Sequence, residues 1–192
     1  MVGHSLGGIY VRVYDAQYPE EVVGMVLVDA THPDNWARRG ESIEMLRIAA
    51  GVSAVLSRFG LMRLAFSGQS FDLPEADGAA LKADIASSQY WDTQRADAAA
   101  MEANAAEGRA AGGLGELPLV VLAAGEYPEG PGRDIKFSLQ HELAASSTNS
   151  VYQEIAGANH ISLLTNHQYA TLVGEAIIRV VEAARTGEAL AQ

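Results

Sequence analysis

The sequence GHSLGG at residues 3–8 decides the fold, because it carries the pattern G-x-S-x-G around Ser5. Glycines on both sides of a serine permit a tight turn from a strand into a helix, and such a turn exposes the serine hydroxyl. A strand-to-helix turn at Ser5 requires a helix after it, and residues 7–18 have the apolar spacing of a helix. Pro19 follows the end of this helix. The alternative is a glycine-rich turn in which Ser5 is only the N-cap of that helix.

Buried strands and helices alternate after this turn. Residues 22–28 and 117–125 are near-continuous apolar runs that are rich in valine and leucine. Runs of this length indicate strands buried on both faces, as in a parallel sheet. Residues 151–155 alternate in polarity like an edge strand, and residues 168–184 have the spacing of an amphipathic helix. The order of these elements predicts the α/β class with a mostly parallel sheet.

The middle of the chain has a different composition. Residues 34–115 are rich in alanine, mostly helical in pattern and interrupted by glycines and Pro74. A segment of this length is not expected to be a structureless loop in a compact domain. We therefore expect residues 1–33 and 116–192 to form the core, and residues 34–115 to be a helical cap inserted into it. The apolar residues near 46–66 are expected either to line a pocket or to pack on the core.

Charge and composition exclude several classes of protein. The 192 residues have a net charge of -11, from 13 Lys and Arg against 24 Asp and Glu, which disfavours nucleic acids and anionic membranes as partners. The sequence shows neither a membrane-spanning apolar run nor a secretory signal pattern, so the expected location is the cytoplasm. There is no cysteine, and no His or carboxylate pair recurs at ligand spacing on one helix. No metal or cofactor is expected.

These features resemble the α/β-hydrolase family. The resemblance rests on the elbow at residues 3–8, the helix that ends before Pro19, the strand that ends at Asp29, and the Asn159-His160 turn before the last helix. It implies the C-terminal part of an α/β-hydrolase fold, from the nucleophile elbow onward, with a helical cap insertion. The order nucleophile, acid, histidine along the chain also agrees with this family.

The resemblance implies a catalytic triad, in which a base activates a serine hydroxyl and an acid orients the base. Ser5 is the expected nucleophile, and the N–H of Leu6 is the expected oxyanion donor. His160 is the expected base, since it lies in the loop where the family carries its histidine. His32 is the strongest rival, although a turn histidine before Pro33 is more often structural. Dehalogenase-like relatives use an aspartate nucleophile, which Ser5 excludes here.

The acid of the triad has two candidates. The commonest family position follows the strand that ends at Gly125, where this chain offers Glu126. Some family members place the acid at the end of the strand after the nucleophile helix, and Asp29 occupies that place. We favour Asp29 over Glu126, and a plain turn-forming aspartate is the alternative role for Asp29. His4 lies inside the elbow and is expected to point elsewhere.

The resemblance implies an enzyme: a serine hydrolase of the carboxylesterase type that cleaves esters of a small hydrophobic substrate through an acyl-enzyme intermediate. Thioesterases, C–C hydrolases and cofactor-free haloperoxidases use the same triad and are alternatives.

The sequence shows only three strands, and the strand before Ser5 is reduced to Met1-Val2. We therefore expect a fold truncated at its N-terminus, in which the run from Val22 has an unpaired edge. An inactive hydrolase fragment is the remaining alternative.

Overall fold

The computed structural model describes residues 1–69 and 71–190, and the chain divides into two compact units. The first unit contains residues 1–39 together with the chain from Asn104 onward. The second unit contains residues 40–103. The role of a cap, which the sequence predicts for the inserted segment, stays a prediction.

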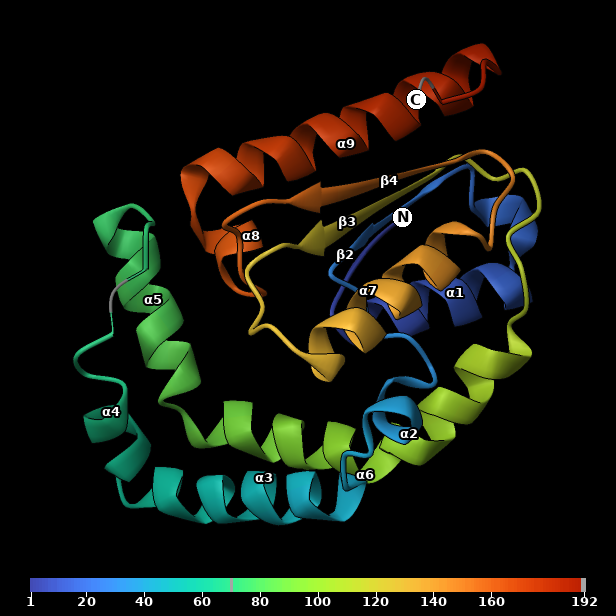
Figure 1. Cartoon of the computed structure of the whole chain (residues 1–192). Helices are drawn as coiled ribbons and strands as arrows, with labels where there is room; N and C mark the ends of the chain where they lie inside the picture. Colours follow the sequence, from blue (N-terminus) through green and yellow to red (C-terminus); the bar gives the residue numbers. More distant parts are fainter. Residues whose placement is uncertain (70, 191–192) are drawn as a thin grey trace. The chain divides into compact units, whose positions relative to one another are not determined.

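A four-stranded parallel sheet forms the centre of the first unit, with the strand order β1-β2-β3-β4 (Figure 1). The strands are β1 (Val2–His4), β2 (Met25–Val28), β3 (Leu119–Ala124) and β4 (Ser150–Ile155). The helices of this unit are α1 (Gly7–Gln17), the short 3-10 helix η1 (Pro19–Glu21), α2 (Asn35–Arg39), α7 (Pro131–Ala144), α8 (Ser162–Thr165) and α9 (His167–Thr186). This arrangement is the α/β fold that the alternating pattern predicts.

The core of this unit has two layers, because alternate side chains of a strand point to opposite faces of the sheet. One layer joins α9 to the sheet through Val26, Val28, Val120, Leu122, Val173, Ala176 and Val180. The other layer joins α1 and α7 to the sheet through Val11, Met25, Leu27, Leu119, Val121 and Leu143. Every residue of β2 and β3 is buried. Complete burial on both faces explains why these two strands are continuous apolar runs.

The strand β1 corrects the expected number of strands. The sequence indicates three strands and leaves the run from Val22 with an unpaired edge. Instead, β1 pairs in parallel with β2, with Val2 opposite Val26 and His4 opposite Val28. That expectation was wrong because three residues are enough to pair with a neighbour but too few to show a strand pattern. As a result, β2 has a neighbour on each side.

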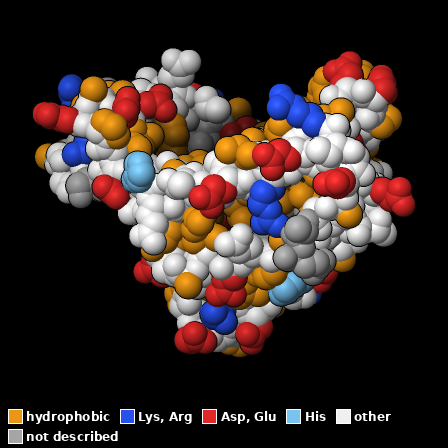
Figure 2. Space-filling view, turned by 90° about the horizontal axis from the view of Figure 1, so that it is seen from above, with side chains coloured by type: hydrophobic (Ala, Val, Ile, Leu, Met, Phe, Trp, Pro, Cys, Tyr) orange, Lys and Arg blue, Asp and Glu red, His pale blue; other side chains and the backbone are white. Residues whose placement is uncertain are grey.

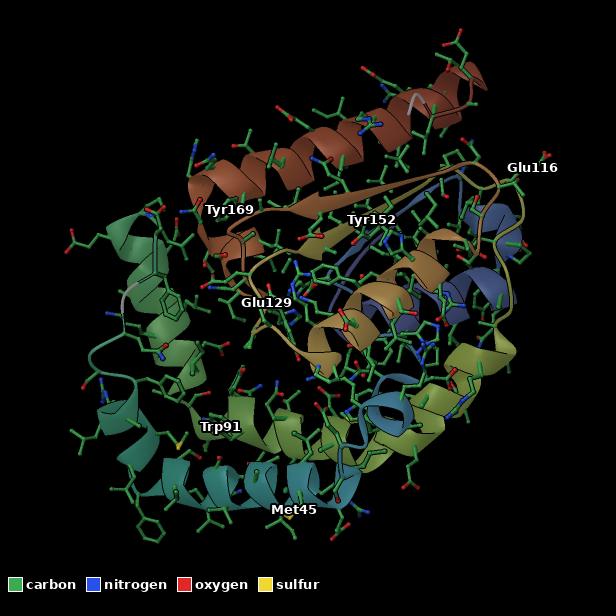
Figure 3. All side chains as sticks on the ribbon, viewed as in Figure 1. Met45, Trp91, Glu116, Glu129, Tyr152 and Tyr169 are labelled. Atoms are coloured by element: carbon green, nitrogen blue, oxygen red, sulfur yellow. The ribbon has the colours of Figure 1, made fainter. Side chains whose placement is uncertain are left out.

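The second unit is helical. Its helices are α3 (Ile43–Arg58), α4 (Leu61–Ala65), α5 (Glu75–Ile85) and the first part of α6 (Ser88–Ala110). Small residues, among them Ala50 and Ala54, form the buried face of α3, whereas Met45 and Phe59 are exposed. Figure 3 labels Met45 on α3. The expectation that the large apolar residues of this stretch line a pocket stays a prediction.

The surface reflects the acidic composition of the chain. Figure 2 shows Asp and Glu side chains spread over one face, with Lys and Arg side chains scattered between them. Within residues 1–69 and 71–190, no helix has the length and apolar character needed to cross a membrane.

Candidate active site

The loops that follow the four strands meet at the carboxyl edge of the sheet. Ser5 follows β1, Asp29 follows β2, Glu126 lies just beyond β3, and His160 lies in the loop after β4. All four residues line one cavity of about 370 Å³. The carboxyl edge of a parallel sheet is the usual position of a ligand site in α/β proteins. Residues that are far apart in the sequence therefore come together here.

The backbone at Ser5 has a conformation that residues other than glycine rarely adopt. Among the residues that the structure describes, Ser5 (φ 55°) and Asp29 (φ 41°) are the non-glycine residues with positive φ. Such conformations cost of order 1–3 kcal/mol and tend to cluster at functional sites. Gly3 makes the turn possible, because a Cβ at this position would lie 2.6 Å from the carbonyl oxygen of Gly7. The N–H of Thr31 donates to the Ser5 carbonyl at 2.8 Å and ties the turn to the loop after β2.

Leu6 is the N-cap residue of α1, so its backbone N–H lies at the start of that helix and next to Ser5 in the chain. The first turn of a helix carries a partial positive charge and unpaired N–H groups, which favour a negatively charged oxygen. This is the position that the sequence predicts for the oxyanion donor, and the role itself is a proposal.

Asp29 and His160 form a direct contact. The Nδ1 atom of His160 lies 2.7 Å from Oδ2 of Asp29, whose side chain is only 5% exposed. The other carboxylate oxygen, Oδ1, accepts a hydrogen bond from the N–H of Ala124 at 2.9 Å and lies 3.1 Å from Nζ of Lys136. Both oxygens of the carboxylate are therefore engaged, and only Oδ2 meets the imidazole.

The surroundings of Asp29 keep its carboxyl group ionised. Burial alone would raise the pKa of Asp29. The hydrogen bond with His160, the charge on Lys136 and the N–H of Ala124 act in the opposite direction, and the net effect holds the pKa of Asp29 below its ordinary value. An ionised carboxylate in this position holds the imidazole with Nδ1–H directed at Asp29, which leaves Nε2 as the basic nitrogen.

The loop that carries His160 is held by a local hydrogen-bond network. The side-chain oxygen of Asn159 accepts from the N–H of Ile161 at 3.1 Å and from that of Ser162 at 2.9 Å. The N–H of Asn159 donates to the Ser162 hydroxyl at 2.8 Å. Glu126, the second candidate for the acid, accepts from Nδ2 of Asn159 at 3.4 Å. Glu126 thus contacts the neighbour of His160, whereas Asp29 contacts the imidazole.

His4 lies against His160, and the expectation that it points elsewhere was wrong. The Nε2 atom of His4 is 2.9 Å from the carbonyl oxygen of His160, and the two ring centroids are 4.3 Å apart. Burial lowers the pKa of His4, and the neighbouring His160 lowers it further. The short parallel strand β1 causes this contact, because it ends at His4 on the same edge of the sheet as the His160 loop.

His32, the rival to His160, has structural contacts. Its Nδ1 accepts from the N–H of Asp34 at 3.1 Å, and its Nε2 lies 3.8 Å from a carboxylate oxygen of Glu142. These contacts join the turn after β2 to α7. They agree with the structural role that a histidine before Pro33 suggests.

The cavity is also lined by polar residues that the sequence analysis did not single out: Asn35, Arg39, Tyr127, Lys136 and Gln140. Lys136 and Gln140 lie four residues apart on α7, and both are buried. The signal that indicates them is their helical spacing with Leu139 and Leu143, which places a lysine and a glutamine on an apolar face. No group of three or more His, Asp or Glu side chains in the described part of the chain is placed to hold a metal ion.

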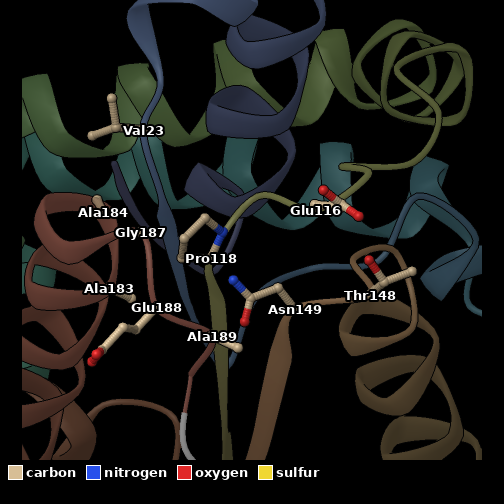
Figure 4. A pocket seen from close by; sticks show the side chains of 10 residues that line it. All are labelled: Val23, Glu116, Pro118, Thr148, Asn149, Ala183, Ala184, Gly187, Glu188 and Ala189. Atoms are coloured by element: carbon tan, nitrogen blue, oxygen red, sulfur yellow. The ribbon is translucent and has the colours of Figure 1, made fainter.

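A larger cavity, of about 620 Å³, lies at the opposite edge of the sheet (Figure 4). Val23, Pro118 and Asn149 line it, and each comes just before a strand. Glu116 and Glu188 give this cavity an acidic character. Among the described residues, neither a serine nor a histidine lines it. The serine, aspartate and histidine that a triad requires therefore line the smaller of the two cavities.

Comparisons with known proteins agree with this architecture. The sequence matches the family model described as the alpha/beta hydrolase family over residues 1–172. The chain belongs to the alpha/beta hydrolase family. This finding confirms the family and the fold class that the elbow and the strand pattern predict. No curated protein sequence matches the chain.

Several solved structures resemble the chain. A haloalkane dehalogenase loop variant from Bradyrhizobium elkanii superposes with a TM-score of 0.63 at 15% identity, over 97% of this chain and 69% of that one. A carboxylesterase structure from Nitrososphaera gargenis gives a TM-score of 0.56 at 17% identity, over 94% and 65%. The enol-lactonase from Burkholderia xenovorans LB400 gives 0.53 at 18% identity, over 94% and 64%. Identities this low show a shared fold, and the chain spans less than two thirds of the last two proteins.

Proposed function

We propose that the protein is a serine hydrolase that cleaves carboxylic esters of a small hydrophobic substrate. The observation that carries this proposal is the 2.7 Å contact between His160 and Asp29 at a cavity that Ser5 also lines. The strained backbone at Ser5 supports it, since such strain is typical of a nucleophile elbow. Membership of the hydrolase family supports hydrolysis in general. A carboxylesterase and a lactonase, which acts on a cyclic ester, are among the similar structures.

The proposed reaction has two halves. In the first, Nε2 of His160 takes the proton of the Ser5 hydroxyl while Oγ attacks the ester carbonyl carbon. The resulting oxyanion is stabilised by the N–H of Leu6. The imidazolium then gives its proton to the departing alcohol, which leaves an ester between the acyl group and Ser5. In the second half, His160 takes a proton from water while the water oxygen attacks the acyl carbon. The imidazolium then returns the proton to Oγ of Ser5 as the bond between Oγ and the acyl carbon breaks, which releases the acid and restores the free hydroxyl and the neutral base.

Asp29 is proposed to orient His160 and to stabilise the imidazolium that forms in both halves. The Asp29→Asn variant is expected to lower kcat for a p-nitrophenyl ester by about 10⁴-fold, because an amide no longer selects the required tautomer. Glu126→Gln is the matched control and is expected to change kcat by less than about tenfold, because Glu126 contacts Asn159. Circular dichroism verifies that both variants are folded. A larger loss in Glu126→Gln than in Asp29→Asn would assign the acid to Glu126.

Thioester cleavage, one of the other reactions of the same triad, is tested by offering matched ester and thioester substrates to the same sample. C–C bond cleavage and haloperoxidation are tested in the same way with a substrate of their own class. An inactive hydrolase is the other alternative, and the chain spans 65% of the carboxylesterase and 64% of the lactonase. Turnover of any of these substrates that depends on Ser5 would exclude this alternative.

A further inference from the structure

Lys136 is a buried cation that the proposed reaction does not use. It lies on α7 and is only 9% exposed. Its Nζ donates to the carbonyl oxygen of Ala124 at 2.9 Å and lies 3.1 Å from Oδ1 of Asp29. Lysine is almost never buried to this extent unless it has a partner of opposite charge. Here the partner is the carboxylate that also contacts the histidine of the site.

The contacts of Lys136 are on one side of that carboxylate. Oδ1 of Asp29 receives both the ammonium of Lys136 and the N–H of Ala124, whereas Oδ2 receives His160. Rotation of the carboxylate would disturb all three contacts at once. The two donors on Oδ1 therefore leave Oδ2 for the imidazole and determine the direction in which Oδ2 points.

Lys136 is itself held in place by its surroundings. Its ammonium lies 5.0 Å from the centroid of the Tyr127 ring and 5.7 Å from that of Phe137, within the range of a cation–π interaction. On α7, the buried residues Leu139 and Leu143 follow Lys136 at three and seven positions, so the lysine belongs to the face that packs on the sheet. This packing keeps the ammonium beside Asp29.

We propose that Lys136 is a positioning residue of the active site, which acts through Asp29. Its charge keeps the Asp29 carboxylate ionised in spite of burial, and its contact with Oδ1 directs Oδ2 at His160. Lys136 touches neither the substrate nor the reacting atoms in this role. The inference rests on the proposed function only where it concerns catalysis, because its electrostatic part holds in the free protein.

Other charged or titratable groups also face the pair formed by Asp29 and His160. They are His4 from β1, Glu126 and Tyr127 from the loop after β3, and Arg39 from α2. Arg39 donates a hydrogen bond to the Tyr127 hydroxyl and lies 5.5 Å from the centroid of its ring. The test leaves all of these groups unchanged, so a shift in titration reports the loss of Lys136 alone.

The first test is a titration of Asp29 by carboxyl ¹³C NMR in the full chain, with Asp29→Asn used to assign the signal. In Lys136→Met, the pKa of Asp29 is expected to rise by roughly 1–3 units, which is the usual effect of losing an opposite charge at this distance. Lys82→Met is the matched control, because Lys82 is the other lysine of the chain and lies on α5. This control is expected to leave the titration unchanged.

The second test is the pH dependence of ester hydrolysis. Loss of the positive charge of Lys136 stabilises the protonated form of the pair of Asp29 and His160. The acidic limb of the kcat/KM profile of Lys136→Met is therefore expected to move to higher pH by roughly one unit or more. The value of kcat is expected to fall while KM changes little, since Lys136 acts on the orientation of the base. A lysine that only supports the fold would lower kcat without moving the acidic limb.

The outcomes of these tests are distinguishable. An unchanged Asp29 titration in folded Lys136→Met would overturn the inference. If this variant does not fold, Lys136→Gln keeps a donor for the Ala124 carbonyl and removes the charge, and it is expected to give the same shift. If neither variant folds, adding Asp29→Asn is expected to restore folding, and failure to do so would overturn the inference. A shifted titration in a chain without Ser5-dependent ester hydrolysis would retain the electrostatic role and reject the proposed function.

Discussion

Gly8 lies in the first turn of α1, where this helix packs against Ala30 in the loop after β2. A Cβ at this position would lie 2.4 Å from the Cβ of Ala30 and 3.3 Å from its Cα. Neither contact can be relieved by moving a flexible side chain, because Ala30 is buried and follows Asp29 directly. The absence of a side chain at Gly8 therefore brings the turn that carries Ser5 close to Asp29, which contacts His160.

The Gly8→Ala variant is expected to lower the free energy of unfolding by about 1–3 kcal/mol, the usual cost of adding a methyl group to a filled core. Gly7→Ala is the control, because among the described residues a Cβ at Gly7 meets no atom within 4 Å apart from its chain neighbours and the backbone of its own helix, and alanine favours the helix. Urea unfolding measures both values. Equal losses of stability in the two variants would contradict this account of the packing.

The sequence indicates part of the site at the scale of residues. The motif and the chain order single out Ser5, Asp29 and His160, and these three residues line one cavity. The contacts of His4 and Lys136 were not predicted, because they join residues whose distance depends on strand register and on the placement of α7. Only the periodicity of α7, with Lys136 on its apolar face, offered a local signal.

Elements of secondary structure with a clear period or a long apolar run agree with the sequence prediction. The helix predicted over residues 7–18 is α1, the amphipathic helix predicted over residues 168–184 is α9, and the apolar run at residues 117–125 contains β3. The strand β1 could not be recognised, because its stability depends on pairing with β2 and not on its own pattern. Local propensity decides the first group of elements, whereas tertiary pairing decides β1.

The start of α9 is fixed by Asn166, whose side-chain oxygen accepts from the N–H of Gln168 at 3.0 Å and from that of Tyr169 at 3.3 Å. Asn166→Ala is expected to lower the free energy of unfolding by about 1 kcal/mol, because these N–H groups lose their acceptor. Asn166→Asp keeps the acceptor and places a negative charge at the helix start, so it is expected to preserve stability. Thermal unfolding compares the two, and an equal loss in both would rule out the capping role.

At the scale of the whole molecule, the contacts within each unit, and not the amino-acid composition, define the two units. The sequence places the change of character at residues 34 and 115, whereas the compact helical unit covers residues 40–103. At one end, Arg38 of α2 donates to Glu142 of α7 at 2.5 Å and joins α2 to the first unit. At the other end, α6 contributes Arg109, which contacts Asp34 at 2.8 Å. Such ion pairs cannot be recognised from alanine content.

The central claim concerns the assembled site, in which residues from the loops after β1, β2 and β4 act together on one hydroxyl. Covalent labelling of the chain with a fluorophosphonate, measured by intact mass, tests this claim directly because the reagent requires an activated serine. We predict a single adduct in the wild-type chain, no adduct in Ser5→Ala, and much slower labelling in His160→Gln. A folded wild-type sample without an adduct, or an adduct that persists in Ser5→Ala, would contradict the assignment of Ser5 as the nucleophile.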